Sequence, residues 1–74
     1  MELYRKISDK GYNFEVYIPS NEKDPLEFQL RALKEGKLVK EVKILMCHEP
    51  LFGVDASDLA NLEKETDELI KSLP

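Results

Sequence analysis

The sequence predicts an α+β fold with the order ββββα: a four-stranded antiparallel sheet of two β-hairpins, with one C-terminal helix packed on one face. Three patterns support this prediction. Apolar and polar residues alternate over residues 12–18, which is typical of a strand with one buried face. A second alternating run over 26–32 leads into a glycine turn and a further apolar run. Residues 55–73 repeat their apolar side chains at the helical period instead.

The first hairpin joins a strand over 2–7 to the alternating strand through a turn at residues 8–11, whose glycine can adopt positive φ. We predict a four-residue loop that pairs Ile7 with Tyr12. In this register Leu3 and Ile7 lie on the same face as the apolar stripe of the second strand. A three-residue loop would place charged side chains on that face, so the side-chain faces select the four-residue form.

Residues 25–35 permit two interpretations. A preceding aspartate, a proline at the first helical position and a glycine just beyond the last are typical of helix boundaries, so a helical 25–35 with the order ββαβα is the alternative. A helix would turn Phe28 away from the neighbouring leucines, whereas a strand places Phe28 and Leu30 on one face. With Gly36 closing a three-residue loop, the strand also brings Phe28 opposite Val42. We therefore predict a second hairpin.

The C-terminal helix is predicted by its cap as well as by its period. Asp55 is a favourable N-cap residue, and Asp58 lies where a negative charge stabilises the positive helix end. The apolar stripe consists of Leu59, Leu62, Thr66, Leu69, Ile70 and Leu73. Residues 55–74 contain six acidic side chains against two lysines. We interpret this excess as a solvated acidic helix face.

Length and composition predict one small globular domain spanning 1–74, with 42% hydrophobic and 35% charged residues. A core of this size supplies only about 3–5 kcal/mol of stability without a disulfide or a metal. A single cysteine and no apolar signal segment near Met1 predict a reducing, cytoplasmic location. The longest apolar runs, such as 44–47, are too short to cross a bilayer, so no membrane insertion is expected.

Chemistry would be expected first at Cys47, His48 and Glu49, which include the only thiol and the only imidazole. A nucleophile–base pair needs the imidazole within hydrogen-bond reach of the sulfur, but neighbouring side chains at a strand end point to opposite faces. Three consecutive residues rarely converge on one tetrahedral ion, so a metal or thiol site would have to be completed by a partner subunit. We therefore predict no catalytic residue, no cofactor and no enzymatic activity.

A nucleic-acid-binding sheet is a further alternative. In the predicted register Tyr4 and Tyr17 lie on the sheet face opposite the helix, where aromatic rings can stack on bases. The net charge of −4 and the glutamates interleaved with the lysines oppose phosphate binding. Nucleic acid is therefore not the expected partner.

The expected role is that of a non-enzymatic protein-interaction or self-associating module. One helix can cover only one face of the sheet, and apolar side chains are predicted on or near the other face: Tyr4, Tyr17, Leu33, Val39 and Leu45. An exposed apolar set of this kind often marks an interface, and edge strands can pair with another chain. We therefore expect a homo-oligomer or a complex with a protein partner.

Overall fold

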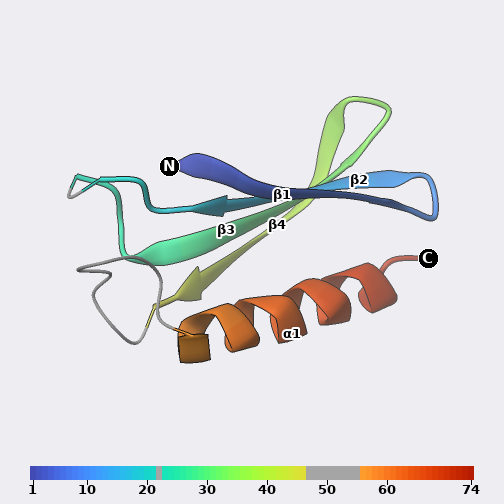
Figure 1. Cartoon of the computed structure of the whole chain (residues 1–74). Helices are drawn as coiled ribbons and strands as arrows, with labels where there is room; N and C mark the ends of the chain where they lie inside the picture. The colour runs from blue at the N-terminus through green and yellow to red at the C-terminus, as the bar shows by residue number, and fades with distance from the viewer. Residues whose placement is uncertain (22, 47–55) are drawn as a thin grey trace.

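Two tight turns and one longer connection set the order of the strands. The computed structural model of the chain describes residues 1–21, 23–46 and 56–74. It contains strands β1 (Glu2–Asp9), β2 (Tyr12–Ile18), β3 (Glu27–Lys34) and β4 (Lys37–Leu45), followed by helix α1 (Ala56–Ser72). The strands form one antiparallel sheet in the order β1-β2-β3-β4, and α1 lies along one face of it (Figure 1). The predicted order ββββα is confirmed, and the helical alternative for 25–35 is wrong.

Both hairpins turn through two residues, and the longer loops expected from the sequence are wrong. Lys10 and Gly11 have φ values of 54° and 81°, and Glu35 and Gly36 have values of 53° and 78°. Two successive residues with positive φ are typical of type I′ turns, whose twist matches that of the paired strands. Lysine and glutamate therefore adopt a left-handed conformation here, although it costs a residue with a Cβ atom about 1–2 kcal/mol.

Most of each hairpin is shifted by two residues from the predicted register. The first shift comes from the shorter turn, and the second from the shorter turn together with the irregularity between Ala32 and Leu33. Ile7 pairs with Phe14, and Phe28 pairs with Ile44. Side-chain faces repeat every two residues along a strand, so this shift leaves nearly the same side chains directed toward α1. The prediction of the buried face therefore survives an error in the pairing.

The predicted position of Leu3 was wrong. The ladder between β1 and β2 is irregular between Leu3 and Arg5, and Leu3 pairs with Tyr17. Paired residues share a face, so this β-bulge moves Leu3 to the face away from α1. Beyond the bulge the alternation follows the prediction, and Ile7 packs against the core.

The core lies between α1 and the two central strands. Its buried side chains come from β2, β3 and α1: Tyr12, Phe14, Val16, Phe28, Leu30, Ala32, Leu62 and Leu69. The members from β2 and β3 occupy alternate positions, as expected for strands with one buried face. Phe28 and Leu30 share this face only because β3 is extended, since a helix would direct them to different sides.

Helix α1 packs with the predicted apolar stripe toward the sheet. Leu62, Thr66 and Leu69 are buried, and the hydroxyl of Thr66 donates a hydrogen bond to the carbonyl of Leu62 at 2.7 Å. This bond satisfies a hydroxyl that has lost contact with water. Asp58 is also buried, at 3% exposure, although the sequence placed it as a charge at the helix start. The acidic residues on the opposite side of α1 are exposed: Glu63, Asp67 and Glu68.

One carboxylate oxygen organises the connection between β2 and β3. Oδ2 of Asp24 accepts hydrogen bonds from the backbone N–H of Ser20 at 2.8 Å and of Asn21 at 3.3 Å, and from the α-amino group of Met1 at 2.7 Å. The bond from the α-amino group, followed by that from Ser20, holds the pKa of Asp24 well below its usual range. The aspartate that resembled a helix start therefore anchors a loop.

Candidate functional site

The sheet face away from α1 carries a row of alternating charges that crosses all four strands. Lys6 pairs with Glu15, Glu15 pairs with Arg31, and Arg31 pairs with Glu41. Paired residues on neighbouring antiparallel strands project from the same face about 5 Å apart, so opposite charges alternate from β1 to β4. Nε of Arg31 lies 3.2 Å from Oε2 of Glu41. The centre of this outer face is therefore polar, and we call these four residues the charge row.

Tyr17 is held by members of the charge row. Its hydroxyl donates a hydrogen bond to Oε1 of Glu15 at 2.9 Å, and the guanidinium carbon of Arg31 lies 5.1 Å from the centroid of its ring. The hydrogen bond to the Glu15 carboxylate raises the pKa of Tyr17, because only the neutral hydroxyl can donate it. Tyr17 therefore remains a protonated donor, and one face of its ring is covered by a cation.

The five predicted interaction residues do not form one patch. Tyr4 and Tyr17 lie near one end of β1 and β2, whereas Leu33 and Val39 lie near the β3–β4 turn, on the other side of the charge row. Leu45 lies at the end of β4, two strands away from Tyr17. The sequence predicted apolar residues on or near this face, but their continuity depends on pairings that it did not predict.

The three most exposed large apolar side chains among the described residues all belong to β4, two near the turn and one at the other end. Leu38, Val39 and Leu45 are 54%, 52% and 80% exposed. The sequence prediction included Val39 and Leu45 but missed Leu38. The length of the turn would have revealed Leu38. A two-residue turn at 35–36 pairs Leu33 with Leu38, and this is the pairing in the structure. The longer loop expected from the sequence hid this pair.

Strand β4 is also an edge strand. Among the residues that the structure describes, β3 is its one strand partner. Its other side therefore presents backbone N–H and C=O groups to which a further strand can bind. Its ladder with β3 is irregular near the turn, where Leu38 pairs with Leu33 and Lys40 with Ala32, and is regular from Lys40 to Leu45. This regular stretch has the geometry that an added strand needs.

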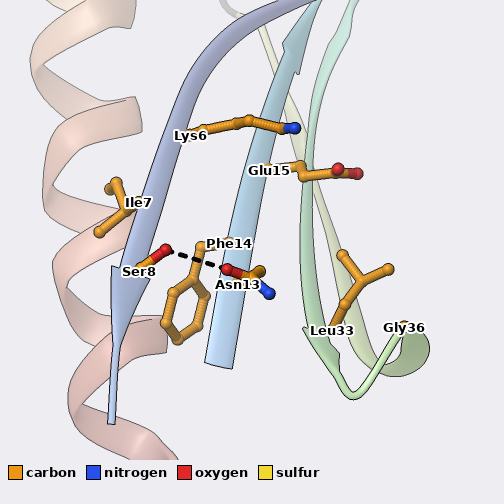
Figure 2. A pocket seen from close by; sticks show the side chains of 8 residues that line it. All are labelled: Lys6, Ile7, Ser8, Asn13, Phe14, Glu15, Leu33 and Gly36. Atoms are coloured by element: carbon orange, nitrogen blue, oxygen red, sulfur yellow. Dashed lines mark hydrogen bonds between the residues drawn. The ribbon is translucent and has the colours of Figure 1, made fainter. Parts of the chain in front are cut away.

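A shallow hollow of about 420 Å³ lies where the outer face meets the β3–β4 turn (Figure 2). Figure 2 shows Lys6 and Glu15 extending from neighbouring strands at its rim, and the hydroxyl of Ser8 donates a hydrogen bond to Oδ1 of Asn13 at 2.9 Å. Its one cation and its one carboxylate belong to residues that pair across β1 and β2. The hollow therefore carries one charge of each sign and has no marked preference for a charged ligand.

The candidate thiol and metal residues Cys47, His48 and Glu49 lie outside the described residues, and their role stays a prediction. In the part of the chain that the structure does describe, no group of three or more histidine, cysteine or acidic side chains is placed to hold a metal ion. Within those same residues, no helix has the length and apolar character needed to cross a membrane.

Comparisons with models of protein families, with curated proteins and with solved structures gave no match to this chain. Its own residues are therefore the basis for assigning a role.

Proposed function

We propose that this chain is a non-enzymatic protein-interaction module, which binds another protein or a second copy of itself through β4 in a reducing, cytoplasmic setting. One observation carries the proposal: β4 has β3 as its one strand partner among the described residues, and it bears the three most exposed apolar side chains of that part of the chain, Leu38, Val39 and Leu45. Burying such side chains contributes about 25 cal/mol for each Å² of apolar surface removed from water. The strand edge adds main-chain hydrogen bonds to the same contact.

A nucleic-acid-binding role for the outer face is less well supported. Such a role needs aromatic rings that are free to stack on bases and a positive field to attract phosphates. The ring of Tyr17 has Arg31 over it, and the glutamates of the charge row balance its cations. The chain as a whole carries a net charge of −4. A salt-dependent mobility shift that Tyr4→Ala combined with Tyr17→Ala abolishes would favour this role over the proposed one.

Sedimentation velocity of the purified protein from about 1 µM to 1 mM tests the proposal, together with affinity capture from a lysate. Wild type is expected either to exceed the monomer mass of 8.6 kDa or to retain a protein partner. Leu45→Glu should weaken that association, because it puts a charge on the proposed contact surface. Leu45 is 80% exposed, so its replacement leaves the core intact. Leu3→Glu on the opposite edge strand is the matched control. A strict monomer at 1 mM that retains no partner would overturn the proposal.

A further inference from the structure

The two edges of the sheet differ in how well they can accept another strand. The ladder of β1 is broken between Leu3 and Arg5, in the first half of the strand. The irregularity of β4 lies next to its turn and leaves Lys40 to Leu45 regular. Bulges protect sheet edges against pairing because they twist the strand away from a flat partner. Strand β4 is therefore the less protected edge.

The charges of β4 fit a second copy of the same strand in one register. Two identical strands can pair antiparallel about a two-fold axis. Residues that lie opposite each other must project from the same face of the sheet. The axis therefore lies midway between the two copies of one residue, which are opposite each other. An axis at Glu41 places the Glu41 side chains of the two copies opposite each other, and an axis at Lys43 does the same with the two Lys43 side chains. An axis at Val42 places Glu41 of each copy opposite Lys43 of the other. The register at Val42 therefore avoids the like-charge contacts of the other two registers and forms two opposite-charge pairs.

The same register also shelters apolar side chains at the margin of the core. Val42 and Ile44 pack against the core but are only partly buried. An axis at Val42 brings the two Val42 side chains together and places the stem of Lys40 against Ile44. On the outer face it places Leu45, the most exposed large apolar residue among those described, at the end of the new strand pair beside Val39. Within the chain, Nζ of Lys43 lies 4.0 Å from Oε1 of Glu41, and the Lys43 side chain is 58% exposed, so it can turn from this long contact toward Glu41 of the other copy.

We propose that two copies of this chain form a two-fold symmetric dimer in which their β4 strands pair antiparallel about Val42, joining both sheets into one continuous sheet. This inference rests on the proposed function, because it names the partner that occupies the β4 edge. A single strand pair is a small contact beside the standard interface of about 1,200–2,000 Å², so the dimer is expected to be weak and to depend on protein concentration.

The test uses two charge reversals, Glu41→Lys and Lys43→Glu, alone and mixed. Each variant alone turns both opposite-charge pairs of the dimer into like-charge pairs and should weaken self-association about tenfold. In an equimolar mixture, position 41 of each copy faces an opposite charge at position 43 of the other, so a mixed dimer should regain roughly the wild-type affinity. Lys37→Glu, a charge reversal on the same strand outside the paired stretch, is the control and should leave association unchanged.

Rescue by mixing separates pairing between chains from effects within one chain. Glu41→Lys also removes the ion pairs of Glu41 with Arg31 and with Lys43, and Lys43→Glu removes the second of these. Both ion pairs lie within one chain and are not restored by adding another variant. Wild-type dimers without rescue in the mixture would overturn the register at Val42 and leave the proposed function intact. A monomer that binds a different protein would overturn the dimer alone. A monomer at 1 mM without any partner would overturn both.

Discussion

Leu62→Ala tests whether α1 is held by the packing described above. Leu62 is 1% exposed and belongs to the buried cluster formed with β2 and β3. The substitution removes three carbon groups at about 0.8 kcal/mol each, roughly 2.4 kcal/mol, and leaves a partly relaxed cavity. We expect a loss of about 3 kcal/mol, within the usual range of about 2–5 kcal/mol for buried leucines. A domain of this size has about 3–5 kcal/mol in total, so the variant is close to unfolding.

Urea unfolding followed by circular dichroism measures this loss. With a slope of about 1 kcal/mol per M for a small domain, the midpoint should fall by about 3 M. Leu38→Ala removes the same atoms from a side chain that is 54% exposed, and should change stability by less than about 0.5 kcal/mol. Equal midpoints for the two variants would refute the packing of α1 on this face of the sheet.

Three further predictions follow from single residues. The pKa of Asp24 is lowered on folding, so its stabilising effect is complete above the ordinary value of 3.8 and is lost as the pH falls below it. Asp24→Asn should therefore lower the melting temperature at pH 7, and the melting temperature of the variant should fall less steeply than that of wild type below about pH 4. Melting temperatures that fall in parallel for the two proteins would contradict this. Gly36→Ala should destabilise the fold by about 1 kcal/mol, because Gly36 has a φ of +78°, which a residue with a Cβ atom adopts at a cost. Glu35→Asn should stabilise the fold, because asparagine favours this position of a type I′ turn. Urea midpoints of the two variants that shift in the same direction would disprove the turn assignment. Ultraviolet titration should find the pKa of Tyr17 raised above its ordinary value of 10.0, and Glu15→Gln should lower it; a titration that Glu15→Gln leaves unchanged would argue against the bond from Tyr17.

The order of the elements and the buried face were predictable because they depend on periodicity. An error of two residues in pairing leaves a period of two unchanged, so the core positions of β2 and β3 followed from alternation alone. Phe28 decided between strand and helix, since it joins the apolar face only in an extended chain. The type I′ turns were harder to predict, because Lys10 and Glu35 stand where asparagine or aspartate would have been the usual signal.

The outer face was less predictable because it depends on exact pairing. The predicted loop of the second hairpin would have placed Arg31 opposite Val39, whereas the observed register places it opposite Glu41. Closer to the turn the predicted loop placed Leu33 opposite Lys37, one residue away from its observed partner Leu38. No residue near the bulge of β1 signals it, since bulges there follow from how the strand twists against its neighbour. Single exposed residues could thus be predicted, but their neighbours could not.

The strand order has a consequence for how this chain folds. Every strand pairs with its neighbour in the sequence, so most contacts of the sheet close short loops and are expected to form quickly. The side chains that cover the apolar face come last, from α1 at the C-terminal end. Hairpins are marginal on their own, so before α1 docks the sheet exposes Phe14, Phe28 and Leu30 beside two open edges. A chain that stops before residue 56 is therefore expected to aggregate, and arrival of the helix completes both stability and solubility.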